Sequence, residues 1–191
     1  PTLQSEQIAT FDAQLFYTSK KFKASLTYYF SKQTQTITEV FTPPVLFPIF
    51  IPPQINYINS GVINYEGIEF ETQWQISPGW SFMGSMSYQE NHDDTGLYDV
   101  GLIPNFMAKA GISYVSPEGI SVGLFNSYYS DSAKLQGTLP LNPPAEGHNW
   151  MTFKGSVPLK ALTDRSDIPN MIFSIYGENL LVEDVYFPEL F

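Results

Sequence analysis

Histidine is the side chain that most often exchanges protons near neutral pH, and this 191-residue chain contains only His92 and His148. Neither has a nucleophile motif beside it, and the chain has no cysteine that could supply a thiolate. Asp93 and Asp94 follow His92, but three consecutive residues do not converge on one metal ion without further ligands. We therefore predict that both histidines are loop residues without a catalytic or metal-binding role.

Three glutamates, Glu66, Glu69 and Glu71, lie close enough in sequence to suggest a pair of carboxyl groups for acid–base chemistry. Glu69 and Glu71, however, are successive polar positions in a segment that alternates polar and apolar residues, so both lie on one face of a strand. We interpret them as a solvated polar row. The sequence thus predicts no enzyme activity and no cofactor.

The segment that carries these glutamates, residues 66–76, has the pattern of a strand between water and an apolar phase. Side chains of a strand point alternately to two faces, so a slip of one residue would move carboxylates into the apolar phase. The register is therefore strongly specified. One face holds Ile68, Phe70, Thr72, Trp74 and Ile76, and the other holds Glu69, Glu71, Gln73 and Gln75.

The same alternation recurs along the whole chain and predicts an all-β fold of eight antiparallel strands. Short turns alternate with long irregular loops, and a tilted strand needs about 9 to 11 residues to cross a bilayer. This arrangement is typical of a transmembrane β-barrel. The predicted strands cover residues 6–18, 22–38, 62–77, 80–90, 106–114, 120–129, 151–157 and 171–178.

Aromatic residues near the strand ends are predicted to mark the two membrane interfaces, because amphipathic rings favour the headgroup level. These residues are Trp74, Trp80, Tyr88, Tyr114, Tyr128 and Trp150. The opposite faces of the strands are rich in small residues, which suits a wide lumen filled by water or by another domain. The small residues are Ser81, Ser85, Ser87, Gly111, Ser113, Ser121, Gly123 and Ser156.

The composition agrees with this interpretation. Hydrophobic residues make up 43% of the chain and charged residues only 15%, whereas soluble domains average about 25% charged residues. A formal net charge of -10 argues against a nucleic-acid partner, because phosphate binding requires clustered Lys and Arg. The absence of cysteine excludes disulfide bonds and thiolate metal sites.

A loop at residues 43–53 combines repeated prolines with large apolar residues. Proline excludes a helix or an interior strand, and apolar side chains are unusual at a solvated loop tip. Two interpretations remain open. The loop binds a partner or ligand, or it packs over neighbouring loops or against the outer leaflet of the membrane.

Several motifs occur in a distinctive order. Residues 59–71 read NSGVINYEGIEFE and are followed by SPGW at 77–80, SMSY at 85–88, LIPNF at 102–106 and GENLLVEDVY at 177–186. Together these segments resemble the C-terminal half of the barrel of TonB-dependent outer-membrane receptors. Residues 177–186 resemble the closing motif of that family, and the order and spacing agree over nearly the whole chain.

The resemblance implies that residues 1–191 form one segment of a 22-stranded barrel, with the N-terminal plug domain and the last strand outside this chain. It implies a place among the lipids of the bacterial outer membrane and active import of a scarce, bulky nutrient, such as a ferric siderophore or similar metal chelate. Energy would come from an inner-membrane coupling protein that acts through the plug. Extracellular loops would bind the chelate, and we expect contacts from Phe47, Phe50, His92, Tyr98, His148 and Asn149.

Two other architectures remain open from the sequence. A self-contained outer-membrane barrel of eight strands would have an adhesive or structural role. A soluble β-sandwich binding module would need the apolar faces of its strands to pair into one buried core. In an outer-membrane barrel Ile68, Phe70 and Trp74 face lipid, whereas in a β-sandwich they are buried by protein.

Overall fold

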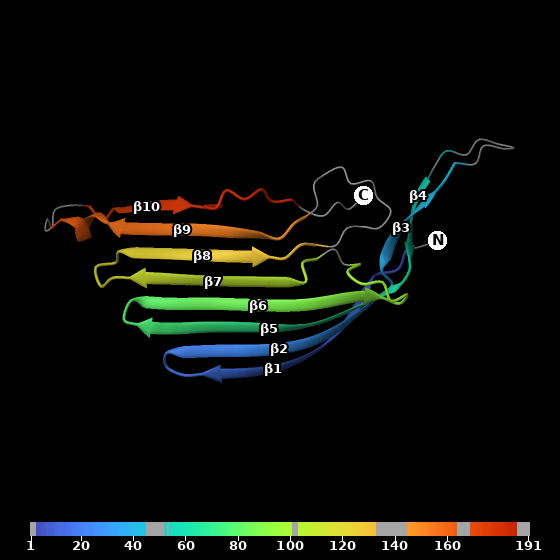
Figure 1. Cartoon of the computed structure of the whole chain (residues 1–191), viewed down its shortest axis with the longest axis horizontal. Coiled ribbons are helices and arrows are strands. Elements are labelled where there is room, and N and C mark those ends of the chain that lie inside the picture. The colour runs from blue at the N-terminus through green and yellow to red at the C-terminus, as the bar shows by residue number, and fades with distance from the viewer. Residues whose placement is uncertain are drawn as a thin grey trace.

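The computed structural model describes residues 3–44, 52, 54–100, 103–132, 145–163 and 169–186, without the side chains of residues 38, 39 and 41. One antiparallel sheet of eight strands dominates the described chain (Figure 1). Its strands, in spatial order, are β1 (Gln7–Thr18), β2 (Phe22–Thr34), β5 (Val62–Ser77), β6 (Trp80–Asp93), β7 (Phe106–Val115), β8 (Ser121–Tyr129), β9 (His148–Pro158) and β10 (Ile172–Gly177). This sheet confirms the predicted all-β fold and its eight antiparallel strands.

From β1 to β9, neighbouring strands of the sheet are joined alternately by tight turns at one end and by longer segments at the other (Figure 1). The turn after β1 is closed by the amide of Ser19, which donates to the carbonyl oxygen of Phe22 at 2.8 Å. In the turn after β5, Gly79 has a φ of +82°, a conformation that favours glycine. A 3-10 helix, η1 (Leu159–Leu162), follows β9 at the same end. Within the described residues, no helix has the length and hydrophobicity to span a bilayer.

The segment between β2 and β5 differs from the prediction. We expected one strand over residues 22–38, but β2 ends at Thr34. The next residue, Gln35, has a φ of +60°, which is incompatible with the extended backbone of a strand. A separate hairpin of β3 (Ile37–Thr42) and β4 (Gln54–Asn59) follows and projects beyond the sheet (Figure 1). Most of the proline-rich loop 43–53 lies outside the described residues, so its role stays a prediction.

Hydrogen bonds fix the base of this hairpin to the segment that precedes β1. The side-chain amide of Asn59 donates to the carbonyl oxygens of Gln4 and Gln35 at 2.8 and 2.7 Å, and its Oδ1 accepts from the amide of Gln4. The carboxylate of Glu6 accepts from the amide of Ile37 at 2.8 Å. The hairpin therefore leaves the sheet in a defined direction.

The strand register places apolar side chains on one face of the sheet. Leu26, Phe70, Met86, Ala108 and Tyr128 are cross-strand partners in one continuous row from β2 to β8. No second layer covers this face: Ile68 is 44% exposed and Trp74 47% exposed.

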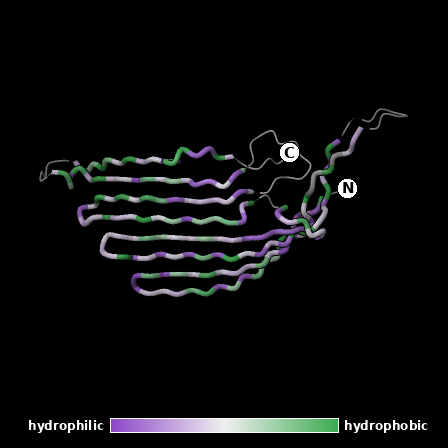
Figure 2. The backbone as a smooth tube through the Cα atoms, in the orientation of Figure 1, coloured by the Kyte–Doolittle hydropathy of each residue, from purple (hydrophilic) through white to green (hydrophobic). Residues whose placement is uncertain are grey.

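Among the described residues, Ala145 is the only buried hydrophobic side chain. Hydrophobic and hydrophilic positions alternate along the strands (Figure 2). The structure therefore excludes the β-sandwich, which would bury the apolar faces of its strands in a common core.

Two aromatic belts border the apolar face. Trp80 and Tyr114 lie near the tight turns, with ring centroids 4.9 Å apart, and Phe106 and Tyr128 lie near the long loops, 6.1 Å apart. Tyr88 on β6 pairs with Phe106 and completes the second belt. At about 3.3 Å per residue and a tilt of about 40°, the strands between the belts span roughly 20 Å of bilayer height.

Trp150 corrects the predicted set of belt residues. Its cross-strand partner is Ser127, which in turn pairs with Lys109 on the polar face. The indole of Trp150 therefore belongs to the polar face, opposite the apolar side chains. Its nearness to a strand end does not reveal this, but its parity does, because Thr152 and Lys154 lie on the same face of β9.

The polar face carries the small residues that the sequence predicted for the lumen. Ser121 and Ser156 are cross-strand partners with their hydroxyl oxygens 2.7 Å apart. Tyr29 lies across Gly67 and donates from its hydroxyl to Oε1 of Gln89 at 3.2 Å. The ring of Tyr29 can lie there because Gly67 has no side chain.

Adjacent residues on opposite faces provide a test of the register. We expect Phe70→Arg, on the apolar face, to destabilise the full-length protein in vesicles by about 2–4 kcal/mol, the cost of a cation near the bilayer midplane. Glu71→Arg, on the polar face, should cost much less. Denaturant titration of protein refolded into vesicles measures both values, and equal costs would contradict the assignment of the faces.

A second test concerns the close approach at Gly67. A Cβ atom there would lie 2.6 Å from the carbonyl oxygen of Tyr88, so Gly67→Ala must displace backbone. We expect a loss of about 1–3 kcal/mol. Gly84→Ala is the control, because its Cβ would meet nothing closer than the Phe82 ring at 3.2 Å. The same titration checks the difference, and a Gly67→Ala protein as stable as Gly84→Ala would refute the packing.

Candidate ligand-binding site

A pocket of about 650 Å³ lies on the polar face at the end of the sheet that carries the long loops. We call it the loop-end pocket. The first residues of β7 and β9, the end of β8 and the segment after β10 supply its walls. The described residues that line it are Ile103, Pro104, Met107, Tyr129, Ser130, Ser132, Ala145, Glu146, His148, Trp150, Val185 and Tyr186.

A stacked pair of rings forms one side of this pocket. Tyr129 ends β8 and His148 begins β9, and the register makes them cross-strand partners. Their ring centroids are 5.2 Å apart with an angle of 22° between the planes. Nδ1 of His148 lies 3.3 Å from the carbonyl oxygen of Glu146. Trp150 follows two positions along β9 on the same face, so the strand pairing itself builds an aromatic wall.

The segment after β10 closes the pocket through two residues of the GENLLVEDVY motif. The side chain of Asn179 donates to the carbonyl oxygen of Glu183 at 2.9 Å and accepts from the amide of Glu183 at 3.0 Å. Oε2 of Glu183 then accepts from the amide of Asn149 at 2.8 Å. These bonds fasten the segment to the start of β9 and place Val185 and Tyr186 at the pocket. The motif thus has a structural role here.

The structure separates the six residues that the sequence nominated for ligand contacts. Phe47 and Phe50 lie outside the described residues. His148 lines the loop-end pocket, but Asn149 shares the opposite face with its partner Tyr128. Its Oδ1 accepts from the side-chain amide of Asn126 at 2.9 Å.

The prediction that both histidines are loop residues is wrong, because His92 lies in β6 and His148 begins β9. His92 and Tyr98 lie together at the outer end of β6, away from the loop-end pocket. They form an isolated β-bridge, and their ring centroids are 5.6 Å apart. The register of β6 with β5 puts His92 on the face of Tyr88, whereas the pocket lies on the other face. Two strands, β7 and β8, separate β6 from β9, which corresponds to roughly 14 Å between the strands that carry the two histidines.

Asp93 organises the turn between His92 and Tyr98, beyond the aromatic belt at Tyr88. Its Oδ1 accepts from the hydroxyl of Thr95 at 2.7 Å and from the amides of Thr95 and Leu97 at 2.9 Å. These hydrogen bonds lower the pKa of Asp93 from its ordinary value, and the bond from the Thr95 hydroxyl makes the largest contribution. The carboxylate therefore acts as a turn-capping group and not as a proton donor.

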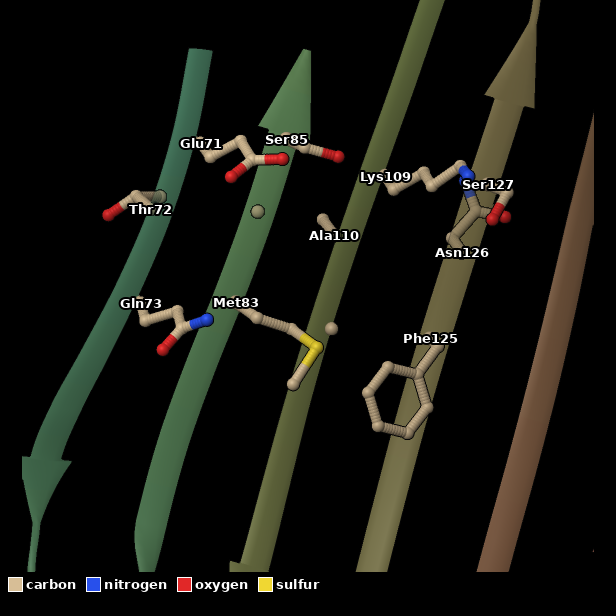
Figure 3. Close-up of a pocket in the computed structure, with 12 residues that line it drawn as sticks. Glu71, Thr72, Gln73, Met83, Ser85, Lys109, Ala110, Phe125, Asn126 and Ser127 are labelled. Atoms are coloured by element: carbon tan, nitrogen blue, oxygen red, sulfur yellow. The ribbon is translucent and has the colours of Figure 1, made fainter. Parts of the chain in front are cut away.

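A second pocket, of about 290 Å³, lies on the polar face in the middle of the sheet (Figure 3). Glu71, Ser85, Lys109 and Ser127 form a row across β5, β6, β7 and β8. Phe125 lies beside this row, where its ring occupies the space above Gly111. This row holds one carboxylate, one ammonium and two hydroxyl groups, so its charges cancel. It contains no nucleophile paired with a base.

Metal-ligating side chains do not gather in the described part of the chain: no three of its His, Asp and Glu residues are placed to hold one ion. The loop-end pocket, with its aromatic walls and a few polar groups, has instead the character of a site for an organic ligand.

Several solved structures share this fold. The copper transporter OprC superimposes with a TM-score of 0.68 at 15% sequence identity, covering 97% of this chain and 28% of OprC. The ferripyoverdine receptor of the outer membrane of Pseudomonas aeruginosa gives 0.65 at 16% identity, over 95% of this chain and 24% of the receptor.

The FrpB iron transporter from Neisseria meningitidis gives a TM-score of 0.58 at 12% identity, over 81% of this chain and 24% of FrpB. This chain therefore spans about a quarter of the length of the structures that it matches. A comparison with curated proteins gave no significant match.

The family comparison agrees with the topology. The model of the family described as "TonB dependent receptor-like, beta-barrel" matches residues 1–153. That match covers most of the chain, from β1 into β9. The apolar face between two aromatic belts and the polar face with small residues are the features such a barrel wall requires. The chain belongs to the β-barrel family of TonB-dependent receptors.

Proposed function

We propose that this chain is part of the wall of an outer-membrane receptor that actively imports a scarce, bulky nutrient, a ferric siderophore or a similar metal chelate. Family membership and the two-faced sheet support the receptor wall. The loop-end pocket carries the proposal of a cargo site, because it faces the lumen and lies at the end with the long loops. The names of the copper transporter, the iron transporter and the ferripyoverdine receptor favour a metal-containing cargo.

The remaining partners follow from the same proposal. Outer-membrane lipid covers the apolar face. The outer edges of β1 and β10, which border the sheet, pair with other strands of the barrel, because unpaired backbone groups are too costly in hydrocarbon. A plug domain faces the polar wall, and an inner-membrane protein supplies energy through the plug. Residues 1–191 then act as one barrel segment without enzyme activity.

For cargo contacts we propose the rings of the loop-end pocket, Tyr129, His148, Trp150 and Tyr186. Phe47, Phe50, His92, Tyr98 and Asn149 stay predictions from the sequence. His92 and Tyr98 would contact a cargo only at the outer rim, since His92 lies on the lipid-side face of β6 and Tyr98 forms a β-bridge with it.

A pair of tryptophan substitutions tests the cargo site in the full-length receptor. Trp150→Leu removes a ring from the pocket, and we expect the ferric siderophore that the unmodified receptor takes up best to bind about tenfold more weakly or worse. Trp80→Leu, on the lipid side at the opposite end, should change binding less than twofold. Uptake of radioactive iron and the Kd of the chelate measure the effect. Equal losses for both variants, or no uptake of any ferric siderophore, would contradict the proposal.

A second prediction concerns the bond that fastens the segment after β10. Glu183→Ala removes the acceptor of the Asn149 amide, and we expect a stability loss of about 1 kcal/mol and chelate binding weakened several-fold. Glu178→Ala is the matched control, because the contact of that carboxylate is with the hydroxyl of Tyr176 at 3.2 Å, away from the pocket. Chelate binding that is the same in both variants would show that Glu183 does not position the pocket.

A further inference from the structure

We infer that the loop-end pocket selects a cargo with a positively charged organic group, such as an alkylammonium, and disfavours anionic chelates. This inference deepens the proposed function and rests on it. It comes from three features of the described residues: the rings that line the pocket, the charge of its lining, and the charge of the surrounding loop end.

The first feature is the number of aromatic side chains that line one pocket. Tyr129, His148, Trp150 and Tyr186 all line the pocket. The face of an aromatic ring carries a negative electrostatic potential and attracts a cation within about 6 Å of the ring centre, most strongly for Trp. Several rings around one site are the arrangement that recognises ammonium groups in proteins.

The second feature is the charge of the lining itself. Glu146 is the acidic residue among the described residues of the pocket, and it is exposed, while none of these residues is Lys or Arg. An anionic chelate would need cationic donors to replace its lost hydration, and the described lining offers none. A cationic group would find both the carboxylate of Glu146 and the ring faces.

The third feature is a strong asymmetry of charge along the strands. The described residues of the long-loop end include a single basic side chain, Lys32, and many acidic residues. The acidic residues are Glu6, Glu66, Glu90, Asp93, Asp94, Asp99, Asp131, Glu146, Glu183 and Asp184. By contrast, Lys20, Lys21, Lys23 and Lys160 lie at the tight-turn end. The negative electrostatic potential of these acidic residues raises the local concentration of cations and speeds their association.

The mid-sheet pocket does not share this selectivity. It offers Glu71 and Lys109 in the same row, so its charges balance. Selection of a cationic cargo is therefore assigned to the loop-end pocket, where the cargo would first contact the wall.

The test uses the full-length receptor and two probes that differ by one charge. One probe is the ferric complex of a linear trihydroxamate with a free alkylammonium, and the other is the same complex with that amine acetylated. We expect the cationic probe to bind about tenfold more tightly at low salt, with a smaller ratio in 0.5 M NaCl because of screening. Glu146→Gln and Tyr129→Leu should each reduce the ratio several-fold. Glu118→Gln, in the turn between β7 and β8, should leave it unchanged.

Equal affinities for the two probes would overturn the inference and leave the proposed import function intact. A ratio that neither Glu146→Gln nor Tyr129→Leu alters would also overturn it. If neither probe binds, the proposal of a chelate of this type fails. The pocket is then tested alone with tetramethylammonium and its neutral isostere neopentane, by saturation-transfer NMR. Transfer to tetramethylammonium that Tyr129→Leu removes supports a cation site without the chelate, and no transfer excludes one.

Discussion

The backbone hydrogen-bond ladder of the main sheet is the constraint on which the rest of the structure depends. In hydrocarbon no water replaces a missing partner, so each strand must be paired along its length. From β2 to β9 every strand of the sheet has a neighbour on both sides, and the pairing is antiparallel throughout. Once the ladder is set, the face of each side chain is determined. The lipid surface, the lumen surface and the loop-end pocket all result from one register.

This constraint also explains why the described chain can do without a hydrophobic core. A soluble domain obtains its stability by covering apolar side chains with protein. Here Leu26, Ile68 and Met86 stay exposed on a single-layer sheet, because the lipid is the phase that covers them. The lumen face is thereby free for small polar residues, and at Gly67 and Gly111 the missing side chain makes room for a neighbouring ring.

The sequence predicted what depends on period-two alternation and failed where a long-range register decides. The eight strands of the sheet and both faces of residues 68–75 follow from local pattern, and the structure confirms them. A register shift between Gln75 and Ser77 interrupts the pairing at Ile76. The face of Trp150 also follows from local pattern, because it has the same parity in β9 as the polar residues Thr152 and Lys154. The prediction from its place near a strand end did not use this parity. Tyr129 could not be predicted as a pocket residue, because nothing local shows that it stacks on His148.

The β3–β4 hairpin lies between two strands that pair with each other directly. Because β2 and β5 form their ladder without it, the insert could be exchanged for one of quite different length at a change in closure entropy of about 0.6 kcal/mol per doubling. The wall would not be disturbed. Chains that differ only in the length of this insert can therefore keep the same pairing of β2 with β5.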